Sequence, residues 1–411
     1  MFNTINEALD YLYSKRNNNK DLSRIKRCIN KLDLNPNYKI ILITGTNGKG
    51  STATYLKNIL KNTLHVGCFT SPFVIRFNER IMINDRQISD AEIMYYMNEL
   101  EKINEWYLTE YKEEIPFFEL TLLMALMYYK DRNIDLGIFE CGIGGLNDAC
   151  NALNPEISII TSIGYDHMDK LGNTLEDILK NKLGIVRDNK TLIYYNNDPK
   201  LDLIYNEYIS KYNLNAINVN NLVNNIKDNN YLEFDYKNNH YKLSMNGYFQ
   251  AYNAAIAIEA VNRLFSNYPN IFIEEGLINT KLPGRLEIIN DNPRIIIDGA
   301  HNDNAIKMLT DYISSNKGNK KLITVFNCLS NKNYKSMLES LDNITDLYLF
   351  LDFEDERKTD ISLFTNVIKK DYKILNELEE IKEYYDSNSI VLFTGSLHFV
   401  SYIKNNINKI L

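Results

Sequence analysis

The 411-residue chain lacks the features that mark membrane, secreted and disulfide-bonded proteins. It contains no stretch of about 18 consecutive apolar residues, which argues against a membrane span. The N-terminal segment "MFNTINEALDYLYSK" does not have the charged-then-apolar layout of a signal peptide. The five cysteines form neither a paired framework nor a CxxC motif, as is usual for reduced thiols inside cells. We therefore expect a cytoplasmic protein without a membrane partner.

Positive charge is also scarce. The formal net charge is -7 and the pI is about 5.5, which argues against broad nucleic-acid binding through a basic face. An acidic protein can still bind anionic substrates if it gathers Lys, Arg, a metal ion or backbone N–H groups at one place. The apolar fraction of 45% is that of an ordinary globular protein, and the length predicts two domains.

Strand-like apolar runs alternate with helical segments through the first part of the chain. We predict strands at 38–43, 136–140 and 156–163, and helices at 51–62 and 117–130. This alternation predicts a parallel sheet, whose ligands bind at the carboxyl ends of the strands.

The rest of the chain predicts an appendage and a second domain. Residues 215–245 alternate in a strand-like manner, which indicates a small antiparallel appendage, and residues 246–265 return to helix. Pro and Gly punctuate residues 280–293, and four apolar runs follow, namely "RIIIDGA", "KKLITVF", "DLYLFLDF" and "SIVLFTG". We predict an α/β protein: a P-loop ATPase domain over residues 1–282 with a parallel central sheet, then a smaller Rossmann-like domain over residues 283–411.

The glycine-rich segment "TGTNGKGST", residues 44–52, lies between a predicted strand and a predicted helix. Its glycines let the backbone turn N–H groups toward phosphate oxygens at a helix N-terminus. Lys49 would neutralise the β- and γ-phosphates, and the Ser51 hydroxyl is placed to bind Mg²⁺. A Gly-rich turn alone often joins a strand to a helix for structural reasons, but this order of Lys, Ser and Thr favours nucleotide binding. The predicted nucleotide contacts in the loop are Thr46, Asn47, Gly48, Lys49, Gly50 and Ser51.

Four further side chains stand near predicted strand ends or in an apolar helix. Glu140 ends a strand, where a buried carboxylate needs a counter-charge such as a metal ion, although a capping role is the structural alternative. His167 follows another strand and would bind a metal through neutral imidazole, but a lone His is more often a packing or surface residue. Ser71 carries no signal by itself. Lys182 ends an apolar helix, where a Lys usually extends to water.

In the second domain, "DGAHN" lies at a predicted turn from strand to helix. From there, Asp298 and His301 are able to reach across a cleft toward a nucleotide on the first domain. Arg285, in "PGR" at the hinge, is able to clamp a phosphate bidentately.

Taken together, these segments resemble the folylpolyglutamate synthase and dihydrofolate synthase family, part of the wider Mur-ligase-like group. "GTNGKGST" is that family's spelling of the loop, which differs from the common P-loop. The other segments follow in family order from about residue 5 to residue 400, which makes the set far more specific than any one motif. They are "SPF…FNERI", "FFELT", "ECGIGG…DACN", "TSIGYDH", "NKLGI", "LPGRLE" and "DGAHN".

The resemblance implies an ATP-dependent ligase that joins L-glutamate to a folate or to dihydropteroate through an acyl phosphate. It implies one or two Mg²⁺ ions, with ligands at Ser51, Ser71, Glu140 and His167. The implied catalytic residues are Lys49, His167 and Lys182, and Lys182 matches the family lysine that is carbamylated.

The resemblance also assigns binding residues. Asn253 in "FQAYNAA" matches the Asn on the adenine side, and the nucleotide site is completed between the domains by Arg285, Asp298 and His301. Phe118 and Glu119 match a stretch that lines a pterin pocket in some members, and Arg80 of "FNERI" is a predicted substrate contact. We expect ATP, L-glutamate and a folate or dihydropteroate as small-molecule partners, no nucleic acid, and a monomer.

The sequence departs from the family at four positions. Leu146 stands where an Arg is usual, Asn181 where an acid precedes the lysine, Phe249 where a His is usual, and Pro116 where a Thr is common. Because the loop and metal positions are intact, these changes bear on pterin preference and on carbamylation of Lys182.

Other functions are weighed against this one. Mur cell-wall enzymes usually carry a domain ahead of the ATPase domain, whereas only about 43 residues precede this loop, which favours the folate branch. A small-molecule kinase would share the loop but would not need the "DGAHN" domain. A paralogue that binds nucleotide or folate without turnover, and another Mur-type amino-acid ligase, are the further alternatives.

Overall fold

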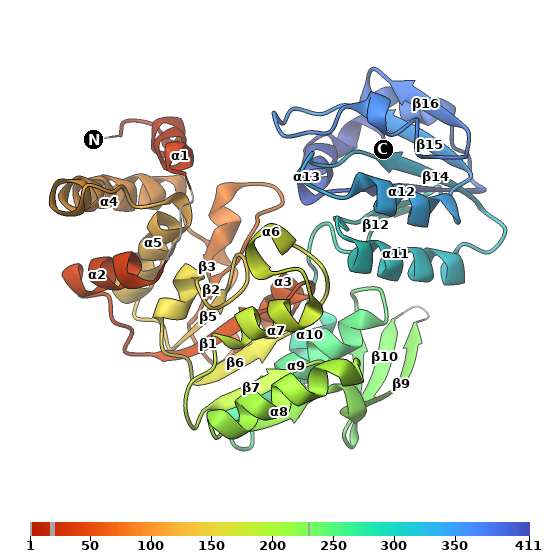
Figure 1. Cartoon of the computed structure of the whole chain (residues 1–411). Coiled ribbons are helices and arrows are strands. Elements are labelled where there is room, and N and C mark those ends of the chain that lie inside the picture. Colours follow the sequence, from red (N-terminus) through yellow and green to blue (C-terminus); the bar gives the residue numbers. More distant parts are fainter. Residues whose placement is uncertain (1, 17–20, 229–230) are drawn as a thin grey trace. The chain divides into compact units, whose positions relative to one another are not determined.

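The computed structural model describes residues 2–16, 21–228 and 231–411 (Figure 1). The chain divides into two compact units. Unit 1 contains Met1–Asn224, Tyr236–Tyr241 and Tyr252–Asn279, and unit 2 contains Asn225–Asp235, Lys242–Ala251 and Thr280–Leu411. Each unit contains a mainly parallel β-sheet together with helices, so the predicted α/β fold class is confirmed. The domain ranges 1–282 and 283–411 stay a prediction.

Unit 1 contains an eight-stranded sheet with the order β4-β3-β2-β5-β1-β6-β7-β8. Neighbouring strands from β2 to β8 are parallel, and β3 pairs antiparallel with β2 and β4. The strands are β1 (Lys39–Thr44), β2 (Val66–Phe69), β3 (Ile81–Ile83), β4 (Arg86–Gln87), β5 (Leu136–Glu140), β6 (Ile157–Ile160), β7 (Thr191–Tyr194) and β8 (Asn215–Asn218).

One assignment in this region is wrong. Residues 215–218 were predicted to belong to the antiparallel appendage, but they form β8, which pairs parallel with β7 at the edge of the main sheet. The physical reason is the helix α8 (Asp202–Lys211), which connects β7 to β8 and returns the chain to the same sheet in a parallel crossover.

The helices of unit 1 cover this sheet. Along β1, Ile40 and Leu42 join a core with α2, α4 and α5, while Ile160 of β6 joins a second core with α7 and α8 (Figure 1). Helix α3 packs against β1, β2 and β5, and α10 packs against α3. The helices are α1 (Ile5–Ser14), α2 (Ser23–Lys31), α3 (Lys49–Leu60), α4 (Asp90–Tyr111), α5 (Phe117–Asp131), α6 (Met168–Leu171), α7 (Leu175–Leu183), α8 and α10 (Asn270–Ile278), with the short 3₁₀ turns η1 (Phe77–Arg80), η2 (Ala149–Ala152), η3 (Pro199–Leu201) and η4 (Asn220–Leu222).

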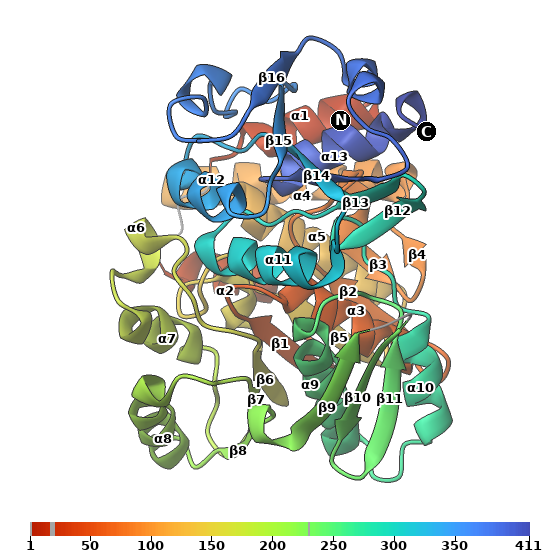
Figure 2. The ribbon, with the colours of Figure 1, turned by 90° about the vertical axis from the view of Figure 1, so that its right-hand side faces the viewer.

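A three-stranded sheet follows, with the order β11-β10-β9 (Figure 2). Its strands are β9 (Val223–Asp228), β10 (Leu232–Tyr236) and β11 (Asn239–Leu243), and helix α9 (Phe249–Leu264) comes next in the chain. Asn229 and Asn230, within the predicted appendage, lie outside the described residues. Burial alternates along β10, as expected for a strand with one covered face.

Unit 2 contains a six-stranded sheet with the order β12-β13-β17-β14-β15-β16, in which only β12 is antiparallel to its neighbour. The four predicted strands correspond to β13, β14, β15 and β17. The elements are β12 (Glu287–Asp291), β13 (Arg294–Ile297), β14 (Lys321–Phe326), β15 (Leu347–Leu351), β16 (Tyr372–Leu375) and β17 (Ser389–Thr394), the helices α11 (Asp303–Asn316), α12 (Tyr334–Asp342) and α13 (Leu397–Asn405), and the turns η5 (Ile361–Leu363), η6 (Leu378–Glu383) and η7 (Ile407–Lys409). Throughout the described part of the chain, every helix is too short or too polar to cross a membrane.

Candidate active site

Four neighbouring parallel strands, β2, β5, β1 and β6, carry predicted site residues at or beyond their carboxyl ends. Ser71 follows β2, Glu140 ends β5, the glycine-rich loop follows β1, and His167 follows β6. Since the carboxyl ends of parallel strands meet at one edge of a sheet, these segments converge where α/β proteins bind ligands.

Hydrogen bonds hold the glycine-rich loop against the segment that follows β6. The N–H of Thr46 donates to the carbonyl of Ser162 at 2.8 Å, and the N–H of Asn47 donates to the Ser162 hydroxyl at 2.9 Å. The Thr161 hydroxyl donates to the carbonyl of Asn47 at 2.6 Å. Thr161 and Ser162 were not among the predicted site residues, although two hydroxyl side chains directly after a strand are the signal that would have found them.

Gly48 is the turning point of the loop. Its φ of 89° lies in the left-handed region that favours glycine, and a Cβ at this position would lie 2.4 Å from Oδ1 of Asn253. Asn253, on α9, is therefore packed against the loop, and its contact with a nucleotide stays a prediction. The Nζ of Lys49 donates to the carbonyl of Gly45 at 3.0 Å, so the ammonium lies over the loop.

The helix α3 begins at Lys49, so Gly50 and the buried Ser51 lie in its first turn. The first N–H groups of a helix have no partner within the helix and attract anions. The glycine-rich loop, Lys49 and the N-terminus of α3 therefore form a region of positive potential that suits a phosphate group.

Glu140 is 3% exposed, and its Oε2 accepts a hydrogen bond from the N–H of Ser71 at 3.1 Å. The carboxylate thus joins the ends of β5 and β2. In the described ranges, no three or more His, Cys, Asp or Glu side chains are grouped to hold a metal ion. A site with one carboxylate and two serine hydroxyls still fits Mg²⁺, which keeps several water ligands and binds substrate phosphates.

His167 is the N-cap of the short helix α6 and has a φ of 49°, and its Nε2 lies 3.9 Å from a carboxylate oxygen of Asp166. Its side chain is 32% exposed, so the imidazole is accessible to solvent. As a nitrogen donor it suits transition-metal ions better than Mg²⁺. Its role as a metal ligand stays a prediction.

Lys182 does not extend to water, because it is only 3% exposed in α7. Burial, together with the nearby positive charge of Lys49, lowers the pKa of its amine to about 7. A substantial fraction of the amine is therefore neutral near pH 7. The mutual influence with Lys49 also places Lys182 near the loop.

The predicted substrate residues have different surroundings. Phe118, in α5, packs against the loop after Glu140, because a Cβ on Gly142 would lie 3.1 Å from its ring. Both carboxylate oxygens of Glu119 accept hydrogen bonds from Arg24, at 2.9 Å each. Glu119 is thus engaged within the protein, and its contact with substrate stays a prediction.

In unit 2, the "LPGRLE" and "DGAHN" segments are joined to each other. The Asp298 carboxylate accepts the N–H groups of Leu286 and Ala300 at 2.8 Å each. Burial raises the pKa of Asp298, and the nearby charge of Arg285 opposes that rise. The Nδ1 of His301 lies 2.8 Å from the carbonyl of Gly299. Arg285, Asp298 and His301 therefore form one cluster, whose reach toward a nucleotide stays a prediction.

Both units of the chain match domains of a known protein family. Residues 43–261 match the Mur ligase middle domain, and residues 284–397 match the Mur ligase glutamate ligase domain. The dihydrofolate synthase/folylpolyglutamate synthase of Bacillus subtilis is 30% identical over 423 residues, which cover 94% of each chain. The chain belongs to the dihydrofolate synthase/folylpolyglutamate synthase family of Mur ligases.

Solved structures agree over almost the whole chain. The folylpolyglutamate synthase of Thermotoga maritima matches with a TM-score of 0.86 and 28% identity, over 98% of this chain and 96% of that chain. A bifunctional folylpolyglutamate synthase/dihydrofolate synthase with Mn, AMPPNP and L-glutamate bound matches with a TM-score of 0.85 and 25% identity, over 98% of both. The resemblance inferred from the motifs is confirmed, and the chain is an ATP-dependent ligase that forms C–N bonds.

The four residues at which this sequence departs from the usual family pattern lie in different parts of the structure. Oδ1 of Asn181 accepts the N–H of Gly145 at 3.0 Å and so holds the loop after Glu140. Leu146, in the same loop, is half exposed. Pro116 is the N-cap of α5, directly before the predicted pterin-pocket residues, and Phe249 packs against the core of unit 2.

Proposed function

We propose that the protein uses ATP to join L-glutamate to a folate, and also to dihydropteroate, with ADP and phosphate as products. The observation that carries this proposal is the convergence of the glycine-rich loop, Glu140 and Ser71 at the carboxyl ends of β1, β5 and β2. Family membership supports the choice of substrates, because the relatives are named for these two reactions.

The chemistry requires neutralisation of charge. The carboxylate of the folate must approach the γ-phosphate of ATP, and two anions repel each other strongly in a site that excludes water. Lys49 and the N-terminus of α3 supply positive potential for the phosphates. A divalent ion, which we expect to be Mg²⁺ held by Ser51, Ser71, Glu140 and His167, would neutralise phosphate charge further.

Two bonds are exchanged in sequence. A carboxylate oxygen of the acceptor attacks the γ-phosphorus, the bond to the β–γ bridging oxygen breaks, and ADP leaves. The neutral amine of L-glutamate then attacks the acyl carbon, phosphate leaves, and the amine loses a proton as the amide forms. Asn253 beside the loop is proposed to contact the nucleotide, and Arg285, Asp298 and His301 of unit 2 are proposed to complete the site.

We further propose that Lys182 carries a carbamate. Its neutral amine would attack CO₂ and lose one proton, which replaces a cation by an anion beside the proposed metal site. The burial of Lys182 and a pKa of about 7 support this reaction, because only the neutral amine is nucleophilic. Incubation with ¹³C-bicarbonate should give a carbamate carbon resonance that Lys182→Met lacks; a spectrum without it in wild type would refute the modification.

A direct assay tests the ligase. Purified protein is incubated with ATP, Mg²⁺ and L-glutamate, plus either dihydropteroate or tetrahydrofolate, and the products are weighed by mass spectrometry. One added glutamate on dihydropteroate shows dihydrofolate synthase activity, and serial additions to tetrahydrofolate show folylpolyglutamate synthase activity. If nucleotide binds and neither acceptor gains mass, the proposed function is wrong.

A further inference from the structure

Arg80 is a buried cation enclosed by aromatic rings. It ends the turn η1 and is 8% exposed, and its guanidinium carbon lies 5.3 Å from the ring centroid of Phe73, 5.9 Å from that of Phe77 and 5.3 Å from that of Phe117. The Nε of Arg80 is buried, and no described residue accepts a hydrogen bond from it. Burial lowers the pKa of this guanidinium to about 10, although the nearby Tyr13 and Glu140 oppose the shift.

A buried guanidinium without an anionic partner is costly. Contact with aromatic faces offsets only part of the free energy that an unpaired charge loses when it is removed from water. Among the residues that the structure describes, no carboxylate forms an ion pair with Arg80. The cation is therefore placed to receive an anionic group from a ligand.

The segment that holds Arg80 is fixed before any ligand binds. The Glu79 carboxylate accepts the N–H groups of Val74, Ile75 and Arg76 at 2.8 to 3.1 Å and closes the loop ahead of the turn. Asn78 donates to the carbonyl of Ile88 at 2.7 Å.

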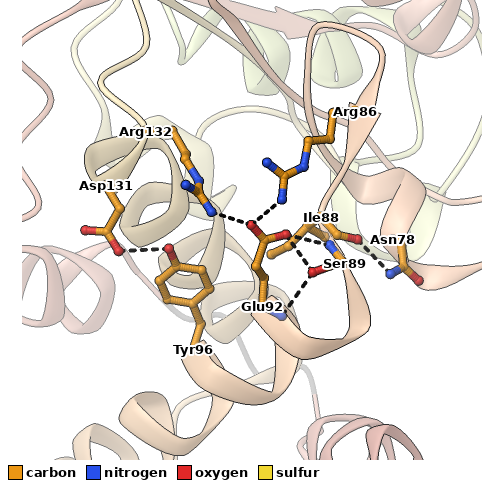
Figure 3. Close-up of polar contacts among 8 residues, drawn as sticks. All are labelled: Asn78, Arg86, Ile88, Ser89, Glu92, Tyr96, Asp131 and Arg132. Carbon is orange, nitrogen blue, oxygen red and sulfur yellow. Dashed lines mark hydrogen bonds and ion pairs between the residues drawn. The ribbon is translucent and has the colours of Figure 1, made fainter.

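Behind this turn, a network of charged and polar side chains anchors α4 and α5 (Figure 3). Glu92 accepts hydrogen bonds from Arg86 at 2.7 Å and from Arg132 at 2.6 Å, and its Oε2 caps the helix at Ser89. Because these surroundings are already ordered, the protein loses less conformational entropy when a ligand binds.

Arg80 also lies beside the proposed reaction site. The carbonyl of Arg80 accepts the N–H of Thr70, which directly precedes Ser71, at 3.0 Å. Its charge and that of Glu140 influence each other. An anion bound to Arg80 is therefore close to the metal-binding end of β5 and β2, where the acceptor carboxylate reacts.

The reacting carboxylate is a poor partner for this arginine. A guanidinium that held both oxygens of the nucleophile would stabilise the ground state and slow its attack on phosphorus. A folate ends in a glutamate, whose γ-carboxylate reacts and whose α-carboxylate does not, whereas dihydropteroate has only the carboxylate that reacts. We propose that Arg80 binds the α-carboxylate of the terminal glutamate of the folate, and that it is a specificity residue for polyglutamylation. This inference rests on the proposed function.

The test measures equilibrium binding in the presence of ADP, with wild type and Arg80→Gln against tetrahydrofolate, its α-carboxamide analogue and dihydropteroate. Wild type should bind tetrahydrofolate at least about tenfold more tightly than the α-carboxamide, as expected for a charge-assisted hydrogen bond. Arg80→Gln should bind those two ligands equally and should bind dihydropteroate as wild type does. In turnover, the change should raise KM for tetrahydrofolate more than it lowers kcat.

Arg76→Gln is the matched control, because it removes the same charge from an exposed side chain of the same loop. It should change none of the three affinities. Equal weakening of all three ligands in Arg80→Gln, or no weakening of tetrahydrofolate, would overturn the inference, as would a wild type that does not distinguish the α-carboxamide. That last comparison needs no variant, so it decides the matter even if Arg80→Gln fails to fold. A wild type that binds the α-carboxylate but ligates no acceptor would refute the proposed function alone.

Discussion

The ion pair between Arg24 of α2 and Glu119 of α5 allows a sharp prediction about stability. Glu119 is 1% exposed, and two parallel hydrogen bonds of 2.9 Å join it to Arg24. The change Arg24→Met keeps most of the side-chain volume and removes the partner of a buried carboxylate. Breaking a buried pair in this way costs about 3–5 kcal/mol. Because the Arg24 side chain keeps 11% exposure, we expect about 3 kcal/mol, measured by urea denaturation at pH 7.5.

The pH dependence of this loss has a definite sign. Burial raises the pKa of the Glu119 carboxyl, and the pairing with Arg24 limits the rise. In Arg24→Met that limit is removed, so the pKa in the folded state moves further above its unfolded value. The native state then binds more protons than the unfolded state, and stability falls as the pH rises through this window. The difference from wild type should therefore be small at about pH 4 and should increase toward pH 8.

Two comparisons separate the ion pair from general effects on α2. Arg27→Met removes an exposed arginine from the same helix, where it donates to the Tyr107 hydroxyl at 3.1 Å, and should cost less than about 1 kcal/mol. The double change Arg24→Met/Glu119→Leu should cost less than the sum of its single changes, because it leaves no charge unpaired. If Arg24→Met stays within about 1 kcal/mol of wild type from pH 4 to pH 8, the reasoning is refuted.

Three predictions concern the site itself. Gly48→Ala should weaken nucleotide binding at least about tenfold, since its Cβ displaces Asn253 and its φ becomes unfavourable by about 1–2 kcal/mol; a fluorescent-nucleotide titration with unchanged affinity would contradict this. Glu140→Ala should reduce kcat by at least about 100-fold while the melting temperature stays within a few degrees, and a near-normal kcat would remove Glu140 from the site. Lys182→Ala should lose activity that millimolar acetate or bicarbonate restores in part, and full activity without either would leave Lys182 as a packing residue.

The sequence predicts the parallel part of the sheet and the chemistry at its edge because both are local in the chain. The apolar runs of β1, β5 and β6 are continuous, as is usual for strands covered on both faces. The strands β4 and β16 were missed because they lie at sheet edges, where exposed residues replace the apolar pattern.

Contacts between distant segments could not be predicted in the same way. The pairing of Arg24 with Glu119 spans 95 residues, and the hydrogen bond from Thr161 to Asn47 spans 114. In neither pair does the local sequence around one residue indicate which residue is its partner. The burial of a side chain also depends on contacts between distant segments. The sequence alone therefore suggests that Lys182 extends to water, whereas the folded chain encloses it.

The departure at Asn181 illustrates how such a contact changes the interpretation of a substitution. From the sequence, the loss of the acid before Lys182 counts against carbamylation. In the structure, the Asn181 amide oxygen accepts the N–H of Gly145, so the loop after Glu140 keeps a hydrogen bond that a carboxylate would also provide. What changes is the charge of the residue that precedes Lys182 in the chain. The carboxyl groups that act on the Lys182 amine are those of Asp166 and Asp148, whereas consecutive residues of a helix do not face each other. The amide at position 181 therefore does not count against the carbamate that we propose on Lys182.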